Sequence, residues 1–145
     1  MKLDNIVKDV RYFVKRCQEY FRYPHTVVIR IKPNEDKDLY CYPLKRPPEI
    51  HLCKKWLIAY NLNKDEARKR IVHEFIHIAF KLPDNIEQLH FYTYPWMDAL
   101  SKTVYEDMRE FKHFDWERIL TKLENNLLNP YWCEELIQNG RLGWW

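Results

Sequence analysis

Glycine is nearly absent from this chain. Only two of the 145 residues are glycine, Gly140 and Gly143, and both lie near the C-terminus. A loop that wraps its backbone closely around phosphate groups needs glycine at several fixed positions. The sequence therefore excludes a Walker-type or Rossmann-type nucleotide site.

Cysteines are few and widely spaced. No C-x-x-C pair occurs among them, which excludes a zinc ribbon. No secretory leader is recognisable at the N-terminus, so we expect reduced, mostly buried thiols in a cytoplasmic protein. The four cysteines are Cys17, Cys41, Cys53 and Cys133.

Long apolar runs are also missing. No stretch approaches the eighteen or so apolar residues that a bilayer span needs, so we expect no membrane partner. The net charge of +3 is too small to indicate nucleic acid. With 46% hydrophobic and 31% charged residues, the composition is typical of one globular domain over 1–145.

The pattern of apolar residues predicts an α+β fold. Apolar residues at steps of three and four predict amphipathic helices, and β-branched runs bounded by turn residues predict strands. The expected helices cover 3–21, 64–81, 95–111 and 116–128, and the expected strands cover 26–31, 39–44 and 49–53. Because Pro47 and Pro48 lack a backbone donor, the run Glu49–Cys53 is predicted to be an edge strand.

The clearest motif is an H-E-x-x-H pentapeptide, His73-Glu74-Phe75-Ile76-His77, in the middle of the strongest predicted helix. Histidines four residues apart project from one face of a helix, so both imidazoles can reach a single Zn²⁺ ion. Glu74 lies about 100° round the helix, where it can act on a water molecule without binding the metal. Alternatively, His73 and His77 are ordinary half-buried histidines, since such a pair needs a third ligand.

Through this motif the chain resembles the zincin metallopeptidases, and most of all the small minigluzincins. The resemblance covers the order of elements from Leu3 to Phe111 and implies a zincin-like fold, with a three-stranded sheet packed on the active-site helix. It implies that His73 and His77 bind Zn²⁺ and that Glu74 is the general base. The strand Glu49–Cys53 would then bind an extended peptide substrate by strand addition.

The third zinc ligand departs from the metzincin pattern, because the histidine spacing of the metzincins is absent: positions 80 and 83 are Phe80 and Pro83. A carboxylate from the following helix is the better expectation. Glu106 is preferred, because Glu106-x-x-x-Glu110 looks like the gluzincin pattern, and Asp98, followed by a small alanine, is its rival. The other candidates are Glu87, His90, Asp107 and Glu110.

The sequence thus predicts a zinc-dependent metallopeptidase that acts on a peptide or protein, with its oligomeric state left open. The alternative is a non-catalytic protein-binding or nucleic-acid-binding module on a zincin scaffold. Residues 129–145 form a C-terminal tail with three tryptophans. We expect this tail either to pack on the domain or, as in minigluzincins, to block the site and hold the enzyme in a latent form.

Overall fold

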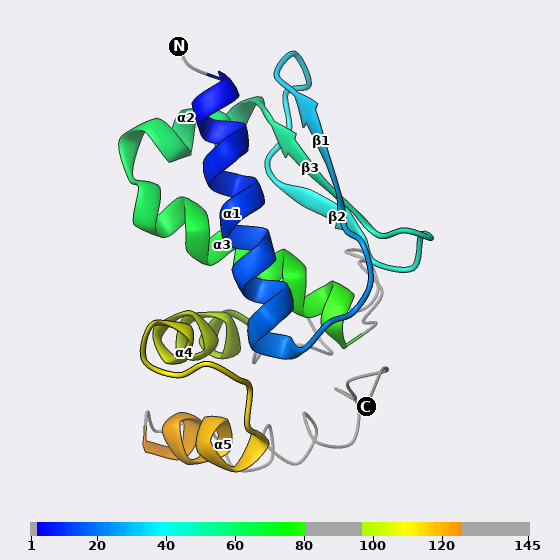
Figure 1. Ribbon diagram of the computed structural model, residues 1–145. Coiled ribbons are helices and arrows are strands. Elements are labelled where there is room, and N and C mark those ends of the chain that lie inside the picture. The colour runs from blue at the N-terminus through cyan, green and yellow to red at the C-terminus, as the bar shows by residue number, and fades with distance from the viewer. Residues whose placement is uncertain (1–2, 81–96, 126–145) are drawn as a thin grey trace.

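The computed structural model describes residues 3–80 and 97–125, and these residues form an α+β structure (Figure 1). Within them lie five helices and a mixed sheet of three strands, so the predicted class is confirmed. In chain order the elements are α1 (Leu3–Phe21), β1 (Val28–Lys32), β2 (Tyr40–Tyr42), β3 (Glu49–Cys53), α2 (Lys54–Leu62), α3 (Lys64–Ala79), α4 (Met97–Glu110) and α5 (Trp116–Asn125).

The strand β3 is central in the sheet, so the prediction that Glu49–Cys53 forms an edge is wrong. The strand order is β1-β3-β2, with β1 parallel and β2 antiparallel to β3. The two prolines precede the strand and remove no donor from its ladder. The carbonyl of Pro48 even accepts a hydrogen bond from the Val28 amide at 2.9 Å. The two edges of the sheet are therefore β1 and β2.

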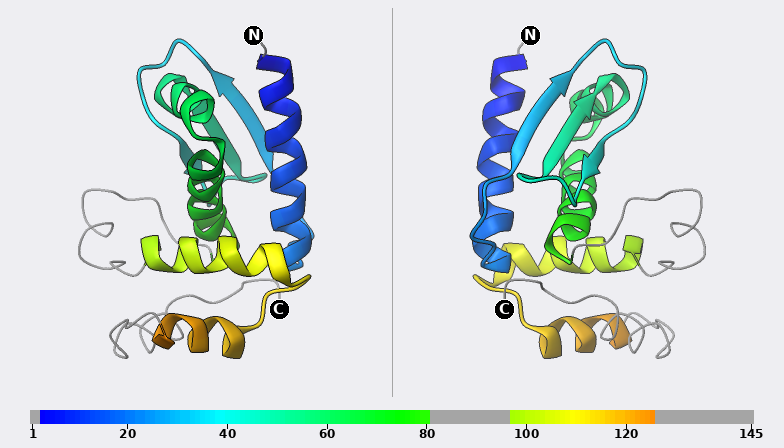
Figure 2. Two further views of the ribbon diagram at one scale, coloured as in Figure 1. Left: turned by 90° about the vertical axis from the view of Figure 1, so that its left-hand side faces the viewer. Right: turned by 90° about the vertical axis from the view of Figure 1, so that its right-hand side faces the viewer.

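The main core lies between the sheet and the helices α1 and α3. Both helices lie on one face of the sheet, and no helix of the described chain lies over the other face (Figure 2). Ile50 and Leu52 of β3 are fully buried, and because they alternate with His51 they point to the same face. Phe21 and Phe75 stack within this core with ring centroids 5.6 Å apart. The packing fixes α3, which carries the motif, against the sheet.

The short helix α2 is not predicted from the sequence. Trp56 is fully buried and donates from Nε1 to the carbonyl of Ala67 at 3.1 Å, which joins α2 to α3. Ile58 and Leu62 are 51% and 82% exposed, so the apolar residues of α2 do not share one face. A helix without an apolar face lacks the periodicity by which helices are recognised in a sequence.

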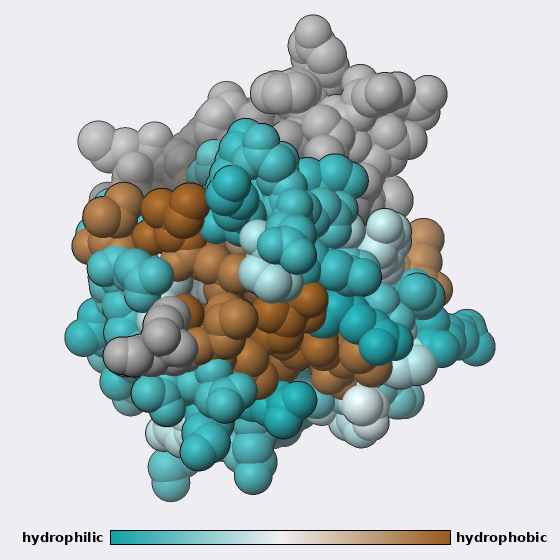
Figure 3. All heavy atoms as spheres, turned by 90° about the horizontal axis from the view of Figure 1, so that it is seen from above, coloured by the Kyte–Doolittle hydropathy of each residue, from teal (hydrophilic) through white to brown (hydrophobic). Residues whose placement is uncertain are grey.

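Apolar surface gathers at the end of the molecule where α1 begins and α2 lies (Figure 3). Exposed Leu3 belongs to α1, and exposed Ile58 and Leu62 belong to α2. The motif begins nine residues after the start of α3, about 14 Å along the helix. This surface is therefore remote from the candidate site.

The remaining boundaries differ little from those expected. The second strand is shorter than predicted, at Tyr40–Tyr42, and α5 is described to Asn125. The α4 helix crosses α3, and α5 packs against α4 on the side away from the sheet (Figure 2). The predicted tail, 129–145, lies outside the described residues. None of the described helices has the length and apolar character needed to cross a membrane.

Candidate metal centre

The H-E-x-x-H motif lies in the C-terminal half of α3. The helix begins at Lys64, where the Asn63 side chain caps it by accepting a hydrogen bond from the Glu66 amide at 3.2 Å. The apolar face of α3 then fixes how the helix is rotated. Its largest fully buried apolar side chains include Ile71, Val72, Phe75 and Ile76.

The two motif histidines project from neighbouring turns of α3. Their ring centroids lie 5.2 Å apart, and the ring planes make an angle of 61°. His77 is only 1% exposed, whereas the His73 side chain is 16% exposed. A metal ion held by both rings would therefore be open to solvent on the side of His73.

The α4 helix brings a carboxylate and a hydroxyl to His73. Asp98 Oδ1 lies 3.5 Å from His73 Nδ1, and Ser101 Oγ lies 3.3 Å from the same nitrogen. Two donors bound to one tetrahedral zinc ion at about 2.0 to 2.2 Å lie about 3.4 Å apart. The separation of Asp98 and His73 therefore fits two ligands of one metal ion. It also fits a hydrogen bond from Nδ1, which would leave Nε2 for the metal.

Glu106, the preferred third ligand in the sequence prediction, lies elsewhere on α4. It is exposed and lies eight residues after Asp98, about 12 Å along the helix. The pKa of Lys69 is raised mainly by its hydrogen bond to Glu66, and the charge of Glu106 adds to this effect. Glu106 is therefore close to Lys69, which precedes His73 by one turn of α3. Asp98, in contrast, lies beside His73 itself.

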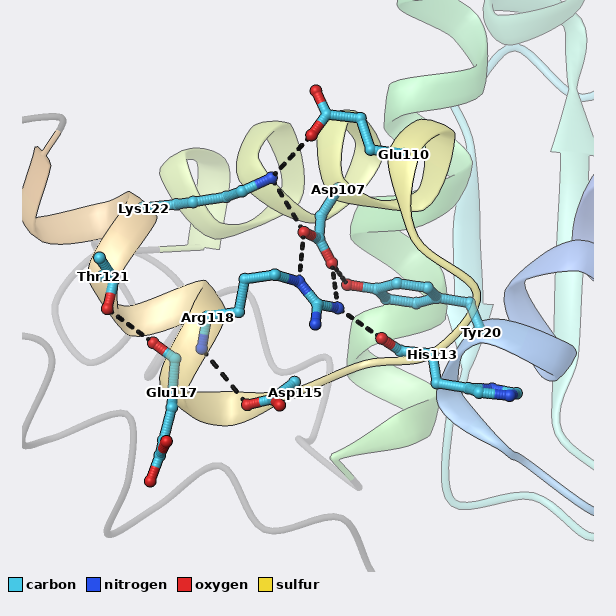
Figure 4. Close-up of polar contacts among 9 residues, drawn as sticks. All are labelled: Tyr20, Asp107, Glu110, His113, Asp115, Glu117, Arg118, Thr121 and Lys122. Carbon is cyan, nitrogen blue, oxygen red and sulfur yellow. Dashed lines mark hydrogen bonds and ion pairs between the residues drawn. The ribbon is translucent and has the colours of Figure 1, made fainter.

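Two further candidates, Asp107 and Glu110, belong to an ionic cluster between α1, α4 and α5 (Figure 4). Asp107 is fully buried and accepts a hydrogen bond from the Tyr20 hydroxyl. It also accepts two from Arg118, whose Nε and Nη2 lie 2.8 and 2.9 Å from its two oxygens. Lys122 lies 2.9 Å from Asp107 and 3.4 Å from Glu110. We call these five residues the Asp107 cluster. Its geometry joins three helices and engages both oxygens of Asp107.

The charges of the Asp107 cluster compensate for its burial. Burial by itself raises the pKa of the Asp107 carboxyl, but the hydrogen bonds from Arg118, Tyr20 and Lys122 outweigh it and hold the pKa below its ordinary value. Asp107 is therefore a buried carboxylate with a structural role. The last two candidates, Glu87 and His90, lie outside the described residues.

The edge strand β2 passes next to Glu74. The Cys41 thiol donates to the backbone carbonyl of Glu74, with a sulfur-to-oxygen distance of 3.6 Å. Arg70, one turn before Glu74, forms an ion pair with Asp38 in the connection that leads to β2. These contacts fasten β2 along α3. Among the described residues no strand pairs with the outer side of β2, so an added strand can pair there.

Two contributors to this site, Ser101 and Cys41, are not predicted from the sequence. Ser101 lies three residues after Asp98, and this spacing on one helix face is the only signal that links it to the site. Cys41 carries no such signal, because its place beside Glu74 depends on the strand order.

Residues 3–80 and 97–125 contain no group of three His, Cys, Asp or Glu side chains close enough to bind a metal together. A complete set requires either a rotation of Asp98 or a ligand from the part of the chain that is not described. Asp98 is suited to such a rotation because its side chain is 99% exposed. Comparisons with known proteins give no match to a family model, to a curated protein or to a solved structure.

Proposed function

We propose that this chain is a zinc-dependent metallopeptidase with a zincin-like fold. The observation that carries the proposal is the pair His73 and His77 on one face of α3, with the Asp98 carboxylate 3.5 Å from His73. Two imidazoles and one carboxylate are a ligand set of catalytic zinc sites. In this proposal Asp98 replaces Glu106 as the third ligand, because of its place on α4.

The proposal assigns the substrate strand to β2. The resemblance to zincins suggests Glu49–Cys53, but this strand is central and both of its sides are paired. The antiparallel edge strand β2 has a side open to pairing within the described chain, and it contacts α3 at Glu74. An extended peptide that pairs with β2 would place its backbone beside the motif.

The chemistry assigned to this chain centres on Glu74. His73, His77 and Asp98 would hold a Zn²⁺ ion, which would supply Lewis-acid chemistry at the scissile carbonyl and lower the pKa of bound water. Glu74 accepts the proton of the attacking water and passes it to the leaving amine.

The test is a metal analysis of the chain purified without a metal-affinity tag, together with a peptidase assay. About one zinc per chain and hydrolysis of unstructured peptides are expected. A chain that retains zinc but cleaves no peptide, even when the tail is removed, would favour the non-catalytic binding module. A chain that cannot be loaded with zinc would rule out the catalytic zinc site and a non-catalytic zinc site alike.

A further inference from the structure

A pocket of about 730 Å³ lies beyond the C-terminal end of β2. Its walls come from three places in the chain: residues 23–26 between α1 and β1, residues 43–48 between β2 and β3, and Ile78 of α3. We call it the β2-end pocket. Its volume is in the range of pockets that hold a small ligand, so it has room for two or three peptide residues.

The β2-end pocket is close to the candidate metal centre. Ile78 follows Glu74 by four residues, about one turn of α3. Along β2, Cys41 contacts Glu74, and Leu44 lies just past the end of the strand, in a turn that the Lys45 amide closes by donating to the carbonyl of Tyr42 at 3.4 Å. Pro43 has no backbone N–H, so the ladder on β2 cannot continue past Tyr42. A peptide paired with β2 would leave the ladder at the entrance of the pocket.

The charges at the β2-end pocket are mainly positive. Arg46 is exposed and forms no ion pair or hydrogen bond with any other residue in 3–80 or 97–125. Lys45 also lines the pocket and lies 3.1 Å from Glu49, a carboxylate that a second cation, Arg30, approaches to 3.5 Å. These two cations more than balance the charge of Glu49, and Arg46 adds a further positive charge.

Most of the remaining wall of the pocket is apolar, and His25 and Thr26 add polar groups. Tyr23 and Ile78 are 8% and 1% exposed, and both border the pocket together with Leu44 and Pro47. A glutamate side chain matches such a surface, because its methylene groups can contact the wall while its carboxylate reaches the guanidinium.

We propose that the β2-end pocket binds an acidic residue of a peptide, Glu or Asp, within a few residues of the bond that is cleaved. The position along the peptide rests on the proposed function, since it takes Glu74 as the point of cleavage. The preference for acid rests only on the pocket, and it is a binding property that does not need hydrolysis.

The test measures binding of fluorescent ten-residue peptides by anisotropy, with the full chain in the presence of EDTA and with Glu74→Gln. The peptides carry one Glu, Gln or Lys, moved through every position of an otherwise neutral sequence. We expect a Glu peptide to bind about five- to tenfold more tightly than its Gln counterpart at one or two adjacent positions. Arg46→Gln should remove this preference, and Arg46→Glu should shift it to Lys.

Arg11→Gln is the matched control, because Arg11 is an exposed arginine on α1 outside the pocket. It should keep the preference for Glu. Equal binding of Glu and Gln peptides, no binding of any peptide, or a preference that survives Arg46→Gln would overturn the inference. A preference lost in Arg46→Gln, in a zinc-loaded chain that cleaves nothing, would support the pocket and reject the peptidase.

Discussion

Asp98 Oδ1 lies 3.5 Å from His73 Nδ1, although the two residues belong to different helices. The contact exists because α4 crosses α3 with Asp98 and Ser101 directed to the same nitrogen. The orientation of α4 about its axis, and the point where it crosses α3, thus determine which of its acidic residues lies beside the motif.

The first prediction separates the two candidates for the third ligand. Asp98→Ala should weaken zinc binding by about 100-fold or more, because a ligand is lost. Glu106→Ala should change it less than about threefold, since an exposed carboxylate at a distance contributes little. Competition with a chromogenic chelator measures both. Equal affinities in the two variants would show that the third ligand lies elsewhere, and His90→Ala would then be the next variant.

The second prediction concerns the roles within the motif. His77→Ala should abolish zinc retention, whereas Glu74→Gln should retain zinc and lower hydrolysis by about 10²- to 10⁴-fold, because it removes a general base. Zinc content and peptide cleavage are measured on the same preparations. Loss of zinc in Glu74→Gln as complete as in His77→Ala would contradict the assignment of Glu74 as a base.

The third prediction concerns the Asp107 cluster. Asp107→Asn should lower the free energy of unfolding by about 3 kcal/mol, because Arg118 and Lys122 would lose their buried counter-charge. Urea unfolding measures the effect. Glu110→Gln is the control, with an expected change below about 0.5 kcal/mol, because Glu110 is exposed. A similar loss in both variants would mean that the buried carboxylate has no special role.

The fourth prediction concerns the acid side of the stability profile. Hydrogen bonds from His51 and then Lys45 lower the pKa of Glu49 from 4.5 to about 2, and the pKa of Asp107 is also lowered. Since the unfolded chain binds protons more readily, stability present above pH 4.5 should be lost as the pH falls toward 2. Glu49→Gln should make this loss shallower in urea unfolding at several pH values. Asp36→Asn, at an exposed position, should leave the slope as it is.

The sequence predicts those parts of the fold that depend on local periodicity. The bounds of α1 agree with the prediction because Ile6, Val10 and Phe13 recur at helical spacing and are all buried. The start of α3 follows from the Asn63 cap. These features are set by neighbours along the chain, so they can be read without knowledge of the tertiary structure.

Pairing and rotation depend on distant residues and are not predicted. The strand Glu49–Cys53 is central because β1 pairs with one of its sides and β2 with the other, and both partners are distant in the sequence. Glu106 and Asp107 are adjacent in the sequence, yet one is exposed and the other is fully buried. Only the packing of α4 against its neighbours distinguishes them.

The shortness of β2 also bears on self-association. A strand of three residues, followed at once by Pro43, gives another copy of the chain too few backbone groups for stable edge-to-edge pairing. At the opposite edge, Arg30 and Lys32 of β1 are exposed and repel a second β1 edge. One side of β2 can thus stay open to a peptide that binds transiently, while both edges of the sheet resist aggregation.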